Sequence, residues 1–301
     1  MITLIFAGCK KFDEIEASKV EIVEEKIERN DRITFDVTYS YPIDLEAVDV
    51  YIADNVNMTN AKSYSCNVEG KKFSVSIDNV NFKKIYYCYE YDNGYEKEKS
   101  EVGRNYYYYG HECVDLGLPS GLLWATCNVG ATSPEDYGNY YAWGETTTKS
   151  DYSSSNSATY GLSISELQSQ GYIDGAGNLN PQYDAATANW GGAWRMPTKA
   201  ELNELINNCT WTWTTQNGVN GYNVEGPNGN SIFLPAAGLR RKSSLDFTGS
   251  HVNYWSSTPL DCYYDDLAYS LNFASDYQGM INYGMINYYR YYGPSVRPVV
   301  E

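Results

Sequence analysis

The segment from Gly249 to Val300 reads GSHVNYWSSTPLDCYYDDLAYSLNFASDYQGMINYGMINYYRYYGPSVRPVV, and the rest of the chain can be organised around it. Ten of the chain's 31 tyrosines lie between His251 and Gly293, separated by Asp, Asn, Ser and Gly, and no Lys or Glu occurs from His251 to Val300. Rigid aromatic area beside short polar side chains is typical of antibody paratopes. Tyr also favours β-strands, so the same composition fits a Tyr-rich sheet that binds nothing.

The residues before this segment predict helices followed by strands. Capping boxes at Ser163–Glu166 and Thr198–Glu201 each predict a helix start, and the second precedes an apolar stripe at Leu202, Leu205 and Ile206. Ser133–Pro134–Glu135–Asp136 also has the form of a helix N-terminus. Strand-like runs then occupy Trp211–Thr214, Tyr222–Val224, Ser231–Leu234 and the Tyr-rich end. This order predicts an α+β domain.

The first third of the chain has a different pattern. Short runs alternate apolar and polar residues at period two, with turn-forming residues between them, at Lys19–Val23, Ile33–Tyr39, Ala47–Ile52, Phe73–Ile77 and Ile85–Tyr91. These runs predict a β-sandwich of fibronectin III or immunoglobulin type over residues 19–103, with a spacer role. We place the domain boundary at the run RNYYYYG, Arg104–Gly110, so that the second domain covers residues 104–301 and the tyrosines of the run pack between the domains.

Composition excludes several classes of function. The chain has 301 residues, enough for two domains, and its net charge of −16 argues against nucleic acid and against electrostatic binding to anionic lipid. His111 and His251 are the only histidines and no cysteine pair has CxxC spacing, so we predict no metal site, no cofactor and no catalytic residue. Asp174–Asn178 lacks the closing Glu of a calcium loop, and we expect a turn there. A paired-carboxylate glycosidase is not excluded by sequence, but no pair stands out.

The N-terminal residues predict export. Met1–Gly8, MITLIFAG, is a short apolar run that ends just before Cys9 and resembles the end of a secretory signal, and FAGC resembles a bacterial lipobox. We therefore predict that Cys9 is lipidated, that residues 1–18 are a signal remnant and tether, and that the protein is anchored by lipid at the outer membrane or cell surface. The alternative is a buried Cys in a first strand. Export permits disulfides among the other six cysteines, including Cys66 with Cys88.

The second domain carries a series of phrases, in order, that are specific to one family. VDLGLPSGLLWATCNVGA, DYGNYYAWGET, DAATANWGGAWRMPTKAEL, IFLPAAGLR, YWSST and RYYGPSVRPV resemble the Fibrobacter succinogenes major paralogous domains, which are common in Bacteroidetes lipoproteins. The resemblance covers roughly His111 to Val300. It implies a C-type-lectin-like fold of the formylglycine-generating-enzyme variety, whose final strands present a ligand-facing surface. That enzyme's activity requires a close cysteine pair, which Cys209 and Cys262 do not provide in sequence.

The C-terminal residues also resemble the variable proteins of diversity-generating retroelements. In those systems, mutagenesis at adenines turns AAC or AAT codons into codons for Tyr, Asp, Ser, Cys and Gly, and such residues crowd this segment. The words Trp255–Ser257 and Ser295–Pro298 bracket them as a scaffold would. A fixed Tyr-rich end is the alternative. We predict these ligand-binding residues: Asp261, Tyr263, Tyr264, Asp265, Asp266, Asp276, Tyr277, Tyr283, Asn287, Tyr288 and Tyr289.

We therefore expect a non-enzymatic, adhesin-like lipoprotein that binds a protein or glycan on another cell or on a host surface. The six predicted tyrosines would be aromatic anchors, and Asp265, Asp276 and Asn287 would supply polar specificity. This hypothesis requires exposed side chains. The alternative is a structural subunit of a pilus or surface assembly, and a carbohydrate-active or formylglycine-generating-type enzyme is third.

Overall fold

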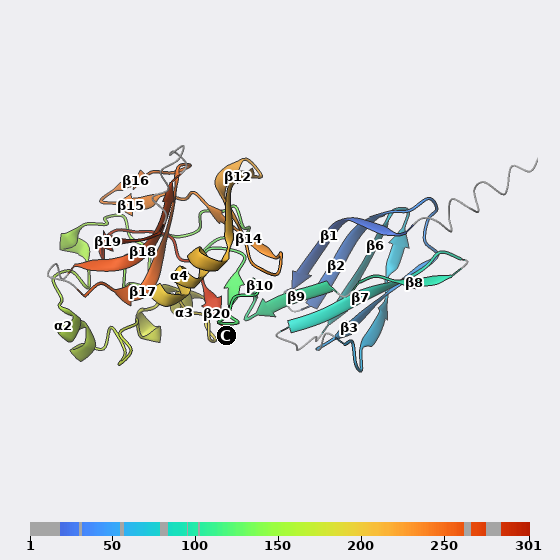
Figure 1. The fold of residues 1–301 in the computed structure, drawn as a ribbon, viewed down its shortest axis with the longest axis horizontal. Helices are drawn as coiled ribbons and strands as arrows, with labels where there is room; N and C mark the ends of the chain where they lie inside the picture. The colour runs from blue at the N-terminus through green and yellow to red at the C-terminus, as the bar shows by residue number, and fades with distance from the viewer. Residues whose placement is uncertain are drawn as a thin grey trace, which may run out of the picture. The chain divides into compact units, whose positions relative to one another are not determined.

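The computed structural model describes residues 19–29, 32–54, 57–78, 84–94, 96–101, 103–261, 266–274 and 284–301. It divides the chain into two compact units, Met1–Gly110 and His111–Glu301, and both are built mainly from antiparallel strands (Figure 1). Among the described residues, no helix is long and apolar enough to cross a membrane.

The first unit is a sandwich of two antiparallel sheets. One sheet has the strand order β1-β2-β6-β5, and the other has the order β9-β7-β3-β4, with β8 paired to β7. Figure 1 shows the two sheets as separate layers. The strands are β1 (Glu21–Arg29), β2 (Arg32–Ser40), β3 (Ala47–Ala53), β4 (Lys62–Ser65), β5 (Asn67–Glu69), β6 (Lys72–Asp78), β7 (Lys84–Asp92), β8 (Lys97–Lys99) and β9 (Gly103–Tyr108).

Period-two alternation explains the core of this unit. Along β2, every second residue from Ile33 to Tyr39 is buried while its neighbours face outward. Tyr87 and Tyr89 of β7 pack against Phe35, with ring centroids 5.2 and 6.2 Å apart. Their hydroxyls donate to the two carboxylate oxygens of Glu25, at 2.5 and 2.7 Å. Tyr87 and Tyr89 are therefore core residues whose hydroxyls are satisfied by Glu25.

Three expectations for this unit need correction. The first strand runs from Glu21 to Arg29 rather than from Lys19 to Val23. Three tyrosines of the run, residues 106–108, lie in β9, which pairs with β7, and the first unit extends to Gly110.

The third correction concerns the disulfide, because Cys66 and Cys88 are free thiols. The backbone of Cys66 bonds to Val48 on one side of β3, whereas Cys88 pairs with Tyr51 on the other side. Since neighbouring strands are about 4.8 Å apart, the intervening strand keeps these two cysteines beyond bonding reach.

The second unit combines four antiparallel sheets with short helices. The sheet orders are β20-β11-β10, β12-β13-β14, β15-β16 and β17-β18-β19. The strands are β10 (His111–Asp115), β11 (Leu123–Ala125), β12 (Thr210–Gln216), β13 (Val219–Glu225), β14 (Ser231–Pro235), β15 (Leu239–Arg241), β16 (Ser244–Asp246), β17 (His251–Pro259), β18 (Leu267–Ala274), β19 (Gly284–Tyr289) and β20 (Val299–Val300). The helices are η1 (Ser154–Asn156), α2 (Ile164–Ser169), η2 (Pro181–Tyr183), α3 (Ala185–Trp190) and α4 (Lys199–Asn208).

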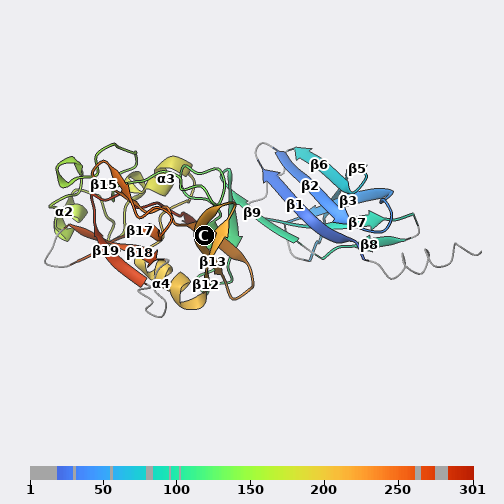
Figure 2. The ribbon, with the colours of Figure 1, turned by 90° about the horizontal axis from the view of Figure 1, so that it is seen from above.

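Both predicted capping boxes are confirmed. Ser163 caps α2 with Glu166, and Thr198 caps α4 with Glu201, with both reciprocal hydrogen bonds present in each box. The apolar stripe of α4 packs on the β17-β18-β19 sheet, where Leu202 and Leu205 share a core with residues of β17 and β18. Figure 2 shows α4 beside β18 and β19.

Two other short motifs of the second unit form turns. Ser133–Asp136 begins no helix but forms a turn, because the Asp136 carboxylate accepts hydrogen bonds from the backbone N–H groups of Thr132 and Ser133 at 3.2 and 3.1 Å. Asp174–Asn178 is a turn, as expected: the Asp174 carboxylate accepts from the backbone of Ala176 and Asn178 at 2.9 and 3.0 Å. That carboxylate is engaged by its own loop.

Two buried tryptophans join the middle of the second unit to its C-terminal sheet. Trp143 donates from Nε1 to the carbonyl of Ser256 at 3.0 Å, and Trp255 donates from Nε1 to the carbonyl of Tyr141 at 2.8 Å. Both rings are fully buried. Trp143 and Trp255, which belong to the sequence motifs YYAWGE and YWSST, are therefore core residues that link residues 141–143 to β17.

Arg297 joins the C-terminal residues to two other strands from a fully buried position. Its Nε donates to Asn128 Oδ1 at 2.9 Å, and its Nη1 donates to the carbonyls of Ala125 and Thr126. Its Nη2 donates to the carbonyl of Phe233 in β14 at 3.0 Å. One side chain thus satisfies four acceptors on two segments, Ala125–Asn128 and β14.

Asp184 is a buried N-cap of α3. Its Oδ1 accepts from the N–H groups of Ala186 and Thr187 at 2.8 and 3.0 Å, and its Oδ2 accepts from the N–H of Met196 at 2.8 Å. The carboxylate therefore caps the start of α3 and also holds Met196, in the segment that leads into α4.

The partly buried ring of His111 leads us to predict that the stability of the second unit depends on pH. Its ring stacks on Trp190, with centroids 3.5 Å apart, and burial lowers the pKa of His111 to about 4. In the unfolded state the pKa of His111 is near 6.5, so the unfolded chain takes up the proton at a higher pH than the folded protein does. Neutral His111 therefore contributes fully to the free energy of unfolding above about pH 6.5, and this contribution is lost as the pH falls toward 4.

We expect the substitution His111→Phe to keep the stacking and to remove this dependence. The measurement is the difference in urea midpoint between the two proteins as the pH is lowered from 7.5 to 4.5. All seven tryptophans lie in the second unit, so their fluorescence reports its unfolding. A difference that stays constant across the pH range would contradict the assignment.

Candidate ligand-binding surface

Both faces of the C-terminal sheet are partly buried, and the register of β18 and β19 sets which side chains share a face. Leu267 pairs with Tyr289, and Tyr269 pairs with Asn287, so these four residues share one face of the sheet. Asn287 and Tyr289 are exposed on it, Tyr289 by 43%. This face continues to the start of α4, where Lys199 Nζ lies 3.8 Å from the centroid of the Tyr269 ring.

Tyr288 lies on the opposite face, so its predicted role as an exposed anchor needs correction. It packs against the core that contains Trp255 and Ala268. Its hydroxyl donates to Asn253 Oδ1 at 3.1 Å and accepts from Asn272 Nδ2 at 3.1 Å. Burial raises the pKa of Tyr288 to about 12. The reason is the period of two along a strand, which separates Tyr288 from both of its neighbours.

Four tyrosines form a cluster of touching rings at the end of β19, which we call the tyrosine surface: Tyr160, Tyr289, Tyr291 and Tyr292. Tyr291 is its centre, with ring centroids 5.1 Å from Tyr289, 5.1 Å from Tyr292 and 5.7 Å from Tyr160. The Tyr289 and Tyr291 rings are stacked, and the other two contacts are edge-to-face. Tyr160 is 46% exposed. Packing against one another leaves these rings rigid while part of their area stays open to solvent.

Hydrogen bonds hold the Tyr160 loop against the strands. The backbone N–H of Gly161 donates to Asp266 Oδ1 at 2.6 Å, and Arg290 Nη2 donates to the carbonyl of Leu162 at 2.6 Å. Arg290 is itself buried, and its backbone N–H bonds to the carbonyl of Asp266 at 2.7 Å. The surface is thus built from segments more than a hundred residues apart, and the Asp266 carboxylate has a positioning role.

The phenol group of Tyr291, at the centre of this surface, is neutral at physiological pH. Burial and the neighbouring tyrosines raise the pKa of Tyr291 to about 12. A neutral phenol both donates and accepts hydrogen bonds, and its ring offers apolar area. The arrangement is therefore equipped for binding through ring contacts and hydroxyl hydrogen bonds.

The other predicted site residues divide into two groups. Asp261 is exposed and Asp266 is half-buried, on either side of a gap in the described chain. The rest lie outside the described residues: Tyr263, Tyr264, Asp265, Asp276, Tyr277 and Tyr283. Cys9 also lies outside them.

Three members of the tyrosine surface are absent from the predicted site. Tyr291 and Tyr292 follow β19 directly and belong to the same Tyr-rich stretch, so their spacing was the available signal. Tyr160 follows a stretch rich in Ser and Thr, and no local pattern connects it with residues near position 290. Within the part of the chain that the structure describes, no group of three His, Cys, Asp or Glu side chains is placed to hold a metal ion.

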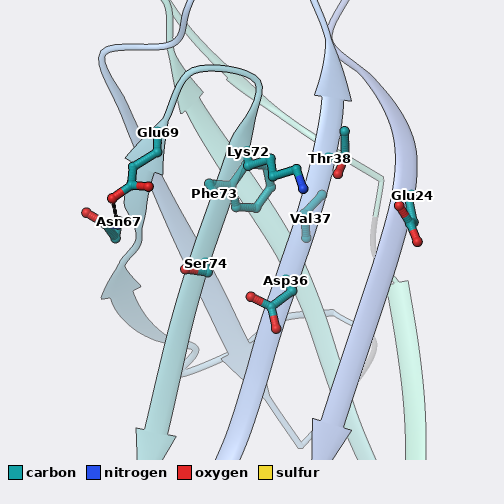
Figure 3. Close-up of a pocket in the computed structure, with 9 residues that line it drawn as sticks. All are labelled: Glu24, Asp36, Val37, Thr38, Asn67, Glu69, Lys72, Phe73 and Ser74. Carbon is teal, nitrogen blue, oxygen red and sulfur yellow. Dashed lines mark hydrogen bonds between the residues drawn. The ribbon is translucent and has the colours of Figure 1, made fainter.

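A groove of about 330 Å³ crosses the outer face of the first unit's β1-β2-β6-β5 sheet. Figure 3 shows the Asn67–Glu69 hydrogen bond on one side of it and Glu24 on the other. Its polar lining includes Asp36 and Lys72, whereas its ring, Phe73, is 1% exposed and faces the core. The groove therefore lacks an aromatic platform, which the tyrosine surface provides.

A second groove of the first unit, of about 470 Å³, lies beside Glu25. Tyr87, Tyr89 and Tyr91 line it, but each of these side chains is at most 6% exposed. Their rings are occupied by packing within the sandwich, so we place the candidate site on the second unit.

Comparisons with known proteins identify no family. The sequence matches no protein-family model and no curated protein. Among solved structures, wild-type OgpA from Akkermansia muciniphila matches at 25% identity over 30% of this chain and only 27% of its own length, with a TM-score of 0.25. The β-1,3-glucan binding domain of carbohydrate-binding module family 56 matches at 14% identity over 29% of this chain and 98% of that domain, with a TM-score of 0.21. Similarities this weak carry no argument about fold or function.

Proposed function

We propose that this protein is a cell-surface ligand-binding protein whose second unit binds a protein or glycan through the tyrosine surface. The observation that carries the proposal is the cluster around Tyr291, because its rings are in mutual contact and partly open to solvent. Tyr is enriched at binding hot spots, since it supplies large contact area at low entropic cost.

The proposal extends to architecture and location. The second unit would be a C-type-lectin-like head, and the first unit would be a fibronectin III- or immunoglobulin-like stalk. Cys9 would carry the lipid that anchors the protein at the outer membrane or cell surface. The phrases of His111–Val300 quoted above support this reading, because they resemble exported lipoprotein domains.

Substitution of Tyr291 by Ala tests the proposal. Removal of the central ring is expected to weaken binding about thirtyfold or more, because hot-spot residues contribute about 2 kcal/mol or more. Binding is measured with labelled protein on a glycan array and on intact bacterial and host cells. Tyr109→Ala is a matched control, since Tyr109 is a 63% exposed tyrosine of the first unit. Equal binding by the two variants would refute a role for the tyrosine surface.

Diversification of this surface is a separate part of the proposal. Its test is the sequence of the gene with its flanking DNA. We expect a near-copy of the codons for Asn253–Arg297 whose mismatches fall almost entirely at adenines, beside a reverse transcriptase gene. A gene without such a template would have a fixed tyrosine surface.

The second candidate function is assembly into a pilus or surface layer. The observation in its favour is β1, an edge strand of its sheet within the described residues, on which Val23 is 65% exposed and Ile22 is 38% exposed. Exposed apolar residues on an edge strand favour pairing with another chain. Analytical ultracentrifugation of the native chain and of Val23→Lys distinguishes the cases: assembly requires a concentration-dependent oligomer that the substitution dissolves.

A further inference from the structure

Positive charge in the second unit is concentrated beside the tyrosine surface. Residues 111–301 contain eight Lys and Arg residues, and three of them are consecutive, at Arg240, Arg241 and Lys242. We call these three residues the tribasic turn, since they lead from β15 into β16. They lie in a chain whose net charge is −16.

The other five cations of this unit are occupied or buried. Lys149 pairs with Glu145 at 2.8 Å, and Arg195 forms a two-bond pair with Glu201. Arg290 and Arg297 are buried, and Lys199 covers the ring of Tyr269. In the tribasic turn, the Arg240 guanidinium lies 5.5 Å from the centroid of the Tyr140 ring and Arg241 pairs with Asp246, whereas Lys242 is exposed.

Backbone hydrogen bonds place the tribasic turn next to the tyrosines. Arg240 and Gly293 exchange both backbone N–H bonds, at 2.8 and 2.9 Å, and Gly293 directly follows Tyr292. Asp246 and the neighbouring Tyr292 side chain both raise the pKa of Arg241. The aromatic and cationic groups are thus parts of one continuous surface.

The local charge stays positive after nearby pairing is counted. Asp246 pairs with Arg241 at 2.7 Å, and Asp266 lies beside Tyr291, so these two carboxylates offset two of the three positive charges and leave one. Arg241 and Lys242 are both exposed, and Lys242 adopts a left-handed turn with φ of 53° at the tip of the hairpin. A ligand in contact with Tyr291 and Tyr292 would meet this positive edge.

We propose that the tyrosine surface and the tribasic turn together bind an acidic sugar, meaning a glycan residue that carries a carboxylate or sulfate group. This inference rests on the proposed function and names its ligand class. Tyrosine rings pack against the C–H faces of a sugar while their hydroxyls bond to its hydroxyls. Guanidinium groups bind carboxylate and related anions through paired, charge-assisted hydrogen bonds.

The net charge of the chain favours a small anionic group over a large acidic partner. A protein with many carboxylates would be repelled by the field of a chain that carries −16. A sugar chain with only one or two anionic groups can place them at the tribasic turn, and the neutral rest of the sugar is not repelled by the chain. The glycan is therefore the ligand that the charge distribution fits.

The test is isothermal titration of the full chain with sialyllactose, sulfated lactose and lactose. We expect the acidic sugars to bind at least about tenfold more tightly than lactose, because charge-assisted hydrogen bonds are roughly twice as strong as neutral ones. Comparison of sialyllactose with sulfated lactose distinguishes a carboxylate from a sulfate ligand. Lys242→Gln is expected to reduce acidic-sugar affinity about tenfold and so to remove most of the difference from lactose, and Lys62→Gln of the first unit is the matched charge control.

The outcomes separate this inference from the proposed function. If Lys242→Gln has no more effect than Lys62→Gln while Tyr291→Ala abolishes binding, the acidic-sugar inference is wrong and the tyrosine surface is still the site. If Tyr291→Ala also leaves binding intact, both proposals fail. No binding of either acidic sugar, or tighter binding of an oligoglutamate peptide that Lys242→Gln weakens, would overturn the glycan assignment.

Discussion

Replacement of Arg297 by Met is expected to destabilise the second unit by about 3 kcal/mol, because it leaves buried acceptors without their donor. Arg297 donates to Asn128 and to the carbonyls of Ala125, Thr126 and Phe233 from a site that is 1% exposed. Burial of a guanidinium has a desolvation cost, but these four acceptors offset it only while they stay in place. Met fills part of the volume and restores none of the hydrogen bonds.

The measurement is urea unfolding of the full chain, followed by tryptophan fluorescence, since every tryptophan lies in the second unit. Arg241→Met is the matched control: its guanidinium is half-exposed and pairs with Asp246 at the surface, where such pairs contribute about 0–1 kcal/mol. A loss for Arg297→Met no larger than that of the control would show that the buried hydrogen bonds contribute little.

Asp184→Ala is expected to cost a similar amount, about 3 kcal/mol, because three backbone N–H groups lose their acceptor at a site that is 2% exposed. Burial raises the pKa of Asp184 to about 6, so the comparison is made at pH 7.5, where the group is a carboxylate. The same fluorescence-detected urea titration applies.

Asp184→Asn supplies the graded control. Its amide oxygen can still accept from Ala186 and Thr187, whereas its NH₂ group faces the N–H of Met196. We expect Asp184→Asn to lower the free energy of unfolding, but by less than Asp184→Ala does. Equal losses for the two variants would mean that the N-cap bonds to α3 contribute nothing and that only the link to Met196 matters.

Local signals in the sequence predicted local structure well. The capping boxes at Ser163 and Thr198 are present, because the partners of a capping box are three residues apart and any folded context preserves them. The alternation of Ile33–Tyr39 and of Phe73–Ile77 likewise corresponds to β2 and β6. The same kind of signal failed at Ser133–Asp136, where the Asp side chain bonds to the turn itself and so competes with a helix.

Composition could indicate the region of the candidate site but not its members. Asn287 and Tyr289 are exposed, whereas Tyr288 between them contributes to the core, and a count of tyrosines cannot make that distinction. Tyr160 joins the surface only because Asp266 and Arg290 hold its loop in place. The tribasic turn is visible in the sequence, but its nearness to Tyr292 depends on the pairing of Arg240 with Gly293.

The two faces of β19 have a consequence for mutational tolerance. Asn287 and Tyr289 project to solvent, and Tyr288 is bonded to Asn253 and Asn272, so neighbouring codons differ in how much a change disturbs the fold. Exposed positions usually change stability by about 0.5 kcal/mol or less, whereas a half-buried, hydrogen-bonded tyrosine does not have that freedom. A lineage can therefore explore new side chains at two positions of one strand without losing the folded protein that carries them.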